Sequence, residues 1–224
     1  MDWDALRISA SLALATALLL TVPGILLARW LAYSLTPWRP LVEASLTVPL
    51  ILPPTVLGFY LLSVLGNSAP LGALYQRMFG APLAFSFTGL LVASLVFNLP
   101  FTVMPMQRAF AAIAPELLDA ARTCGLSRWR TLWRIELPLA WPGLLTALIM
   151  TAAHTLGEFG VVLMVGGNIP GETRTIAIAI YDRVQAFELQ SAANMSALLL
   201  VISLAALMVV SWLGASRRRE RGLW

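Results

Sequence analysis

Two ionisable side chains of the fourth apolar segment are candidates for proton transfer. His154 and Glu158 are four residues apart, so a helix would place them on one face, beside Thr151 and Thr155. Placing a charged side chain at the centre of a bilayer costs about 3 kcal/mol or more, so an ionisable residue in a membrane span is first considered as a functional residue. They would line a pathway or relay protons; alternatively, Glu158 caps a turn or pairs with Arg174, and His154 is a hydrogen-bonded packing residue. For Glu158 we favour the structural role, because a carboxylate would repel the cargo of any pathway that carried anions.

Uncharged polar groups would contact a passing ion more weakly than charged groups. Asn98 and Thr102 are four residues apart in the third apolar segment and would offer neutral donors. A conducting path needs weak sites, because an ion that is held tightly does not leave. The alternative, which we favour, is that these side chains hydrogen-bond between helices in the core.

Two adjacent prolines interrupt the second apolar segment. In "LPPTVLG", Pro53 and Pro54 remove two backbone donors, and Thr55 follows. A carbonyl freed in this way needs a partner in hydrocarbon, so such breaks occur against neighbouring helices or a wet cavity. Kinked packing is one interpretation, and a pathway lining, as in broken transporter helices, is the other. The candidate pathway residues are therefore Pro53, Pro54, Thr55, Asn98, Thr102, Thr151, His154 and Glu158.

The residue inventory excludes several kinds of site. All fifteen basic residues are arginine, so the chain lacks the lysine of a phosphate-binding loop. ATP and its Mg²⁺, if used, must be bound by another subunit. Cys124 and His154 are the single residues of their types, so one chain can build neither a disulfide nor a cysteine/histidine metal site. We expect no catalytic residue, no cofactor and no metal in this chain, and no binding of nucleic acid.

The composition is that of an integral membrane protein. Apolar residues make up 59% of the chain and charged residues 12%, with a mean hydropathy of +0.81. A bilayer core requires about 20 apolar residues in a helix. We therefore expect an all-α membrane protein, a single transmembrane domain over residues 1–224, with five spans. A sixth span, at 173–189, is the alternative, but its charges favour a short amphipathic surface helix. The expected spans cover residues 8–27, 46–65, 84–106, 139–165 and 195–213.

Arginine placement predicts the orientation. Positive charges accumulate on the cytoplasmic side, and four arginines lie within residues 217–221. With five spans, this places the C-terminus in the cytoplasm, together with the segments after spans one and three, and the N-terminus in the periplasm of an inner membrane. Arg108 counts among the cytoplasmic arginines.

The segment 115–138 has the pattern of two short helices joined at an elbow. Pro115 suits a first helical position, and Glu116 complements the positive end of the helix. Gly125 can end that helix in the left-handed conformation, and Ser127 can cap the next one. We expect Pro138 then to turn the chain back into the membrane. Such an elbow suits a mechanical contact with a soluble partner.

The same segment resembles the coupling motif of ABC importer permeases, E-A-A, three residues, G, nine residues, I-x-L-P. The chain has aspartate, Asp119, where the family usually has glutamate. The resemblance implies that the elbow docks into a cytoplasmic ABC ATPase, and that two permease copies and two ATPases form the working unit. The coupling residues it implies, with the flanking ones, are Glu116, Asp119, Ala120, Ala121, Gly125, Leu126, Arg128, Ile135, Leu137 and Pro138.

Two longer stretches, "LILPPTVLGFYLL" and "GEFGVVLMVGGNIPGETRTIAIAIYD", are similar to the molybdate permease branch of that family. This implies import of molybdate delivered by a periplasmic binding protein, which would dock at the loop with Asn168, Pro170 and Gly171. Sulfate, thiosulfate or tungstate are alternative cargoes, because sulfate permeases have similar stretches. A proton-coupled secondary transporter using His154 and Glu158 is the alternative from another class.

Overall fold

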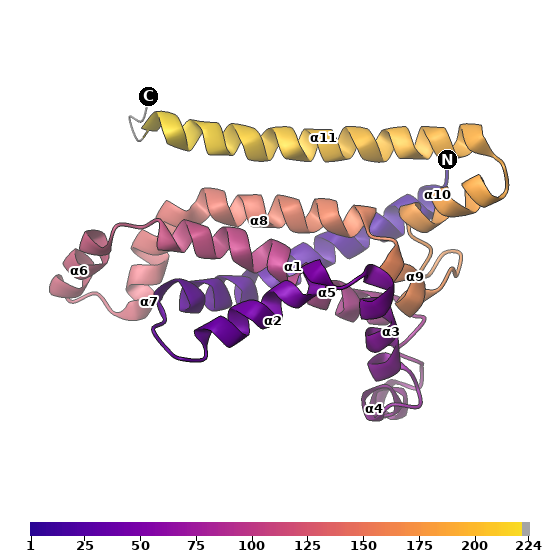
Figure 1. Ribbon diagram of the computed structural model, residues 1–224, viewed down its shortest axis with the longest axis horizontal. Helices are drawn as coiled ribbons and strands as arrows, with labels where there is room; N and C mark the ends of the chain where they lie inside the picture. Colours follow the sequence, from indigo (N-terminus) through magenta and orange to yellow (C-terminus); the bar gives the residue numbers. More distant parts are fainter. Residues whose placement is uncertain (221–224) are drawn as a thin grey trace.

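A computed structural model describes residues 1–220, and the side chains as far as Trp212. Every regular element of this described part is a helix. The long helices α1 (Trp3–Tyr33), α5 (Phe87–Ala111), α8 (Leu137–Gly157) and α11 (Leu189–Glu220) run along the long axis of the molecule (Figure 1). Figure 1 also shows that α6 and the end of α11 lie at one end of the molecule, which we call the elbow end, while the N-terminus lies at the other.

Helices α1, α5 and α8 form the core. Their shared cluster includes Leu31, Met106, Phe110 and Ala147, all of them buried. Small residues bring the helices close together: a Cβ at Gly24 of α1 would lie 2.7 Å from Cγ2 of Thr102. This is how membrane helices associate, since lipid offers no hydrophobic drive between them. By contrast, the apolar stretch of α11 is only 6% buried, against 50% for α5, so α11 is the peripheral span.

The second expected span is a broken one. Helices α2 (Arg39–Ile51) and α3 (Pro54–Leu65) meet at an angle of 111°, so the two prolines interrupt the expected span 46–65, as predicted. Leu52 and Pro53 adopt extended backbone between them, with ψ of 137° and 136°. A residue before proline is pushed out of the helical region, and both Leu52 and Pro53 precede a proline. Four helices are long and apolar enough to span a membrane, or five if the bent pair counts as one.

The fourth expected span, 139–165, is also divided. Helix α8 ends at Gly157, and Glu158 is extended, with ψ of 129°, before the short helix α9 (Gly160–Gly166) begins. The break between α8 and α9 lies against the break between α2 and α3, because a Cβ at Gly160 would lie 2.7 Å from Cβ of Pro54. In these two segments the apolar runs in the sequence are continuous but the helices are not.

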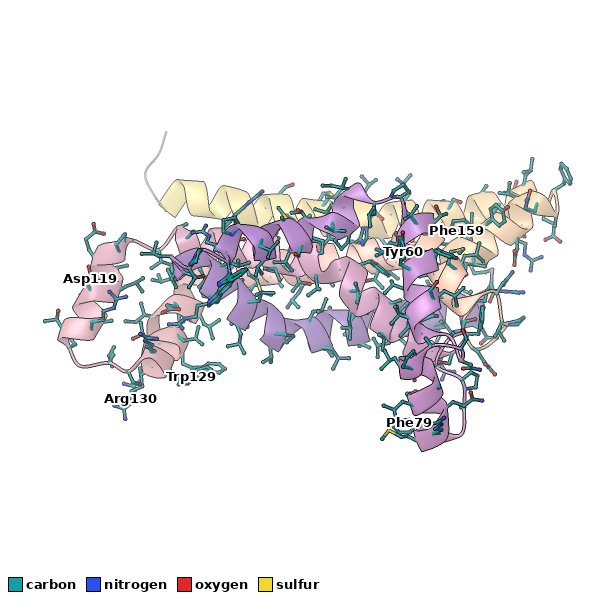
Figure 2. All side chains as sticks on the ribbon, turned by 60° about the horizontal axis from the view of Figure 1, so that its bottom comes forward. Tyr60, Phe79, Asp119, Trp129, Arg130 and Phe159 are labelled. Atoms are coloured by element: carbon teal, nitrogen blue, oxygen red, sulfur yellow. The ribbon has the colours of Figure 1, made fainter. Side chains whose placement is uncertain are left out.

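Short helices account for the rest of the described chain. Helix α10 (Ile176–Gln185) has ten residues, about 15 Å of helix, which is too short to cross a bilayer. It buries Ile176, Ile178 and Ala179, as expected for an amphipathic element, so no sixth span is present in the described residues. Helix α4 (Pro70–Phe79) and α3 project sideways from the bundle, with Phe79 at the tip (Figure 2). Arg221, one of the arginines used for orientation, lies outside the described residues.

Candidate functional site

The elbow has the expected local structure. Helix α6 (Pro115–Thr123) starts at the proline after extended Ala114, and Gly125 follows it with a φ of +72°. Ser127 Oγ accepts from the Arg130 N–H at 3.4 Å and so caps the four-residue helix α7 (Arg128–Thr131). The residues expected to end and begin these helices therefore do so.

The exposed side of the elbow faces away from the bundle. Asp119 and Arg122 form an ion pair at 2.8 Å in which both side chains are mostly exposed. Glu116 and Ala120 are also exposed, as is Arg128, whereas Leu126 is half-buried. Figure 2 shows Asp119, Trp129 and Arg130 at the end of the molecule. A partner at this end would meet a charged surface.

Ala121 does not belong to that exposed surface. Its side chain is 3% exposed, and its carbonyl accepts from the Leu126 N–H at 3.1 Å. Ala120 and Ala121 are both among the coupling residues that the resemblance implies, but the turn at Gly125 folds the chain back over Ala121. Ala120 alone of the pair remains accessible.

The end of the motif is helical rather than a turn. A π-helical segment, η1 (Leu132–Glu136), joins α7 to α8, so the helical backbone continues from Arg128 to Gly157. Pro138 lies in the first turn of α8 and does not turn the chain, contrary to expectation. A proline is tolerated in the first turn of a helix, where the missing N–H costs least. Ile135 and Leu137 are half-buried beside it.

A buried ion pair, which the sequence analysis did not identify, lies at this segment. Glu136 is 2% exposed and accepts two bonds from Arg29 of α1, from Nε at 2.5 Å and from Nη2 at 2.9 Å. The sequence offered only a weak signal. Glu136 is an acidic residue just before the fourth expected span, and Arg29 is an arginine just after the first, so both lie on the same side of the membrane. Pairing across 107 positions is not visible from spacing.

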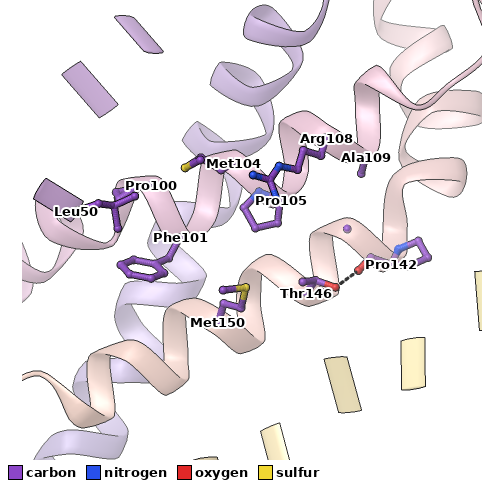
Figure 3. Close-up of a pocket in the computed structure, with 11 residues that line it drawn as sticks. Leu50, Pro100, Phe101, Met104, Pro105, Arg108, Ala109, Pro142, Thr146 and Met150 are labelled. Carbon is purple, nitrogen blue, oxygen red and sulfur yellow. Dashed lines mark hydrogen bonds between the residues drawn. The ribbon is translucent and has the colours of Figure 1, made fainter. Parts of the chain in front are cut away.

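An open groove runs between α2, α5 and α8 (Figure 3). It has a volume of about 460 Å³ and a mostly apolar lining. Arg108 is its charged residue, and Thr146 donates its hydroxyl to the Pro142 carbonyl at 2.7 Å. None of these residues was among the pathway candidates. The groove is lined by Leu50, Pro100, Phe101, Met104, Pro105, Arg108, Ala109, Pro142, Gly143, Thr146 and Met150.

A second cavity, which we call the histidine cavity, adjoins the groove and shares Leu50 and Phe101 with it. Its volume is about 180 Å³, and it brings together three of the expected pathway residues, Pro54, His154 and Glu158. The broken ends of α2 and α8 form much of its wall. The groove and the histidine cavity together follow one face of the bundle.

The remaining polar candidates lie elsewhere. Asn98, Thr102 and Thr151 are at most 1% exposed and line neither cavity. The Asn98 amide donates to the Ser94 carbonyl and to Oγ1 of Thr155, both at 2.9 Å, and Thr102 and Thr151 share a bond of 2.7 Å. In this conformation they bond helix to helix, which is the alternative we favoured.

Three candidate residues lie at the break between α2 and α3, and only one of them lines a cavity. Pro54 lines the histidine cavity, whereas Pro53 and Thr55 are exposed and line neither cavity. Extended backbone at Pro53 directs the chain out of the bundle into α3. Adjacent positions in the sequence thus do not share one surface.

His154 and Glu158 both have structural partners. His154 Nδ1 lies 3.1 Å from Oδ1 of Asn98, and its ring stacks on Phe101 at 3.8 Å between centroids. Glu158 Oε1 accepts from the Val161 N–H at 2.9 Å and so caps α9. This matches the capping role that we favoured for Glu158; Arg174 instead bonds Oδ1 of Asn168 at 2.6 Å.

The loop expected to meet a binding protein is held together by polar contacts. Asn168 bonds Arg174 on one side and donates to Oδ2 of Asp182 at 2.8 Å on the other. Thr173 is buried and donates its hydroxyl to the Gly166 carbonyl at 2.7 Å. Pro170 and Gly171 are exposed at its tip. These contacts fix the loop more than its glycine and proline content suggests.

Comparisons with known proteins place this arrangement among transport proteins. The family described as "Binding-protein-dependent transport system inner membrane component" matches residues 9–221. The chain is 44% identical over 222 residues to the molybdenum transport system permease protein ModB of Azotobacter vinelandii, covering 99% of this chain and 97% of that one. ModB of Escherichia coli K12 is 34% identical over 223 residues, with the same coverage. A probable sulfate transport system permease protein, cysT of Nephroselmis olivacea, is 30% identical, covering 98% of this chain and 77% of that one.

Solved structures share the fold. The chain is similar to a chain of the bacterial alginate ABC transporter, with a TM-score of 0.71 and 18% identity, covering 96% of this chain and 78% of that one. It is also similar to a chain of the MetNI methionine ABC transporter, with a TM-score of 0.65 and 18% identity, covering 95% and 94%. At such identity, the likeness concerns the fold alone.

Proposed function

The chain belongs to the family of binding-protein-dependent transport system inner membrane components, and on this premise we propose that it is the membrane-spanning permease subunit of an ATP-driven importer of molybdate. The observation that carries the proposal is the 44% identity, over nearly the full length of both chains, to a molybdenum transport permease. The chain itself performs no covalent chemistry, and a separate ABC ATPase binds ATP and Mg²⁺ and hydrolyses ATP.

The elbow is the proposed contact with the ATPase. Its exposed surface of Glu116, Asp119, Ala120 and Arg128 offers charges of both signs at one end of the molecule. Helical backbone continues from α7 into α8, so a displacement of the elbow is passed into the membrane without an intervening loop. In the working unit, ATP binding draws two such elbows together and opens the cavity outward, and hydrolysis reverses the movement.

The proposed assembly has two copies of this chain, two ATPases and a periplasmic oxyanion-binding protein. The elbow end faces the cytoplasm, which agrees with the arginines of the elbow and of the C-terminal tail. The loop with Asn168, Pro170 and Gly171 then faces the periplasm, where the binding protein docks. The rest of the exposed apolar surface contacts lipid.

The proposed path for the anion is the groove and the histidine cavity, closed by the second copy. The lining is mostly apolar, and Arg108 is the cation that an oxyanion would meet in the groove. A path with few strong contacts releases its ion quickly, so selectivity is left mainly to the binding protein. Glu158 is used in capping α9 and takes no part in carrying the anion.

A reconstituted system tests the function. The chain is purified with its ATPase and binding protein and placed in liposomes that contain ATP, with the binding protein and radiolabelled molybdate outside. We expect molybdate uptake that requires ATP and binding protein. Excess tungstate, sulfate and thiosulfate are added in separate arms, and sulfate that competes better than molybdate would reassign the cargo. Uptake in vesicles without ATP, driven by a pH gradient, would support a secondary transporter instead.

A further inference from the structure

The buried ion pair of Arg29 and Glu136 joins two parts of the molecule that are far apart in sequence. Both guanidinium-to-carboxylate bonds are short, at 2.5 and 2.9 Å, and Glu136 is 2% exposed while Arg29 is 26% exposed. A two-pronged bond of this kind fixes the orientation of both side chains as well as their distance. It is therefore a geometric clamp between two helices.

The clamp lies at the point where the elbow enters the bundle. Glu136 is the last residue of the π-helical segment Leu132–Glu136, which joins α7 to α8. Arg29 lies near the end of α1, one turn before Tyr33. Arg29 Nη2 also approaches the carbonyl of Arg128, the first residue of α7, at 3.5 Å. One side chain of α1 thus contacts both ends of the segment between the elbow turn and α8.

Tyr33 extends the clamp to the other side of the elbow. Its ring lies 5.9 Å from the Arg29 guanidinium carbon, and its hydroxyl donates to the Phe110 carbonyl at 3.1 Å. Phe110 is in the last turn of α5, just before the chain leaves for α6. The end of α1 is therefore bonded to the chain on both sides of the elbow.

Part of helix α6 faces α1 across an open space. A cavity of about 410 Å³ lies between them, lined by Arg29, Tyr33, Leu118, Arg122, Leu126 and Glu136 among others. The base of the elbow is joined to α1 by these polar bonds and by apolar packing, in which Leu118 of α6 contacts the core cluster that contains Leu31 and Leu132.

Movement of α1 would reach the interior of the bundle. Its middle bonds α5 through Thr16 and Ser94 at 2.8 Å, and Gly24 packs directly on Thr102. Ser94 in turn accepts from Asn98, which contacts α8 through Thr155. An element that is fastened at the elbow end and bonded along its length carries displacement toward the histidine cavity.

We infer that Arg29 and Glu136 are positioning residues that fasten α1 to the base of the elbow, so that α1 moves with the elbow during transport. The inference rests on the proposed ATP-driven import. In this role the pair couples ATP hydrolysis to molybdate transport. An elbow released from α1 would still dock on the ATPase, so hydrolysis would continue without transport. Loss of the pair then uncouples the two.

The test is the ratio of molybdate imported to ATP hydrolysed, measured in liposomes with the assembled complex. For Glu136→Gln we expect this ratio to fall about five-fold or more, in the range of typical coupling effects, while binding-protein-dependent hydrolysis persists. Arg29→Gln should do the same, and the double variant should be no worse than either, because both act through one contact. An unchanged ratio in assembled Glu136→Gln complexes would overturn the inference. Absence of molybdate-dependent hydrolysis in the unaltered complex would instead count against the proposed function.

A more exposed ion pair elsewhere, Arg39 with Glu43, serves as the control for loss of charge. Glu43 of α2 accepts from Arg39 at 3.1 Å and from Gln107 at 2.7 Å, so it too joins two helices, but it does not touch the elbow. Glu43→Gln should keep the unaltered ratio. A fall equal to that of Glu136→Gln would show that any lost charge has this effect, and would overturn the specific role of the pair.

A distance measurement covers the case in which Glu136→Gln does not assemble. Leu35 is 97% exposed just beyond α1, and Trp133 is 67% exposed in the π-helical segment. Both are replaced by labelled cysteines in a Cys124→Ser background, with one labelled copy per complex, and the pair itself is left intact. We expect the 35–133 distance to stay constant between nucleotide-free and ATP-trapped complexes. A 35–133 distance that changes with ATP would show that the elbow moves without α1, and would overturn the inference.

Discussion

Gly143 of α8 and Ala109 of α5 lie so close together that a Cβ at position 143 would be 2.3 Å from the Cβ of Ala109. Both residues line the groove, so this close approach of the two helices also forms part of one wall of the proposed path. Replacing Gly143 by valine should force α5 and α8 apart, at a cost of roughly 1–3 kcal/mol or more of stability. The measurement is the thermal unfolding midpoint of the purified protein in detergent. Gly157→Ala is the control, because no atom lies within 4 Å of a Cβ at that position; equal midpoints for the two variants would contradict the packing argument.

Gly125 and Gly80 offer a matched pair for testing the elbow. Their φ angles are +72° and +73°, and a Cβ at either would meet no atom within 4 Å, so any side chain causes similar backbone strain. Strain at a left-handed position costs on the order of 1–3 kcal/mol. We expect Gly125→Val to abolish ATP-dependent uptake in inserted protein, because it distorts the elbow, whereas Gly80→Val at the end of α4 should retain uptake. Similar uptake by both variants would remove the coupling role of the elbow.

Glu158→Gln should keep most of the transport activity. The glutamine retains a carbonyl oxygen that can accept from the Val161 N–H, so the cap of α9 survives without the charge. Glu158→Ala should lose about 1 kcal/mol of stability, as other cap removals do. Uptake rates and unfolding midpoints of both variants are to be compared. Complete loss of uptake in Glu158→Gln would revive a proton relay through Glu158 and His154.

Arg108 should matter for an anionic cargo. It is the charged residue of the groove, so Arg108→Gln should lower molybdate uptake by about ten-fold, equivalent to about 1.4 kcal/mol of lost attraction. Arg108→Lys should keep most of the rate because the charge stays. Arg77→Gln in the projecting α4 is the control. If Arg108→Gln and Arg77→Gln transport equally well, the anion does not follow the groove.

Asn98→Leu should destabilise the protein although the side chains are similar in size. The substitution removes one amide that serves Ser94, Thr155 and His154, all within the core. Each buried polar group left without a partner costs about 1–3 kcal/mol, so the unfolding midpoint should fall by many degrees. Hydrogen exchange in α5 and α8 reports the same loss locally. An unaltered midpoint would indicate that these groups find other partners, and would reopen the pathway role for Asn98.

Much of the helix-level structure was predictable because it depends on local chemistry. Pro115, Gly125 and Ser127 begin, end and cap helices where expected, since proline, glycine and serine act on the backbone of their immediate neighbours. The break at Pro53 was also visible, but its angle of 111° was not, because packing of α3 on α9 sets the direction in which the chain leaves. The end of α8 at Gly157 was not predicted, and the turn predicted at Pro138 is absent, for a related reason. An apolar run in the sequence does not reveal where its helix begins or ends.

The sequence by itself determined that this is an all-helical membrane protein with a polar elbow, and which family it belongs to, because composition and motif spacing are properties of the chain alone. Only the tertiary structure decided which polar residues meet. It buried Asn98, Thr102 and Thr151 between helices, assigned Glu158 to a cap, and joined Arg29 to Glu136. These outcomes depend on the rotation and spacing of helices around one another, which close contacts such as Gly143 on Ala109 fix. No periodicity within one helix encodes that rotation.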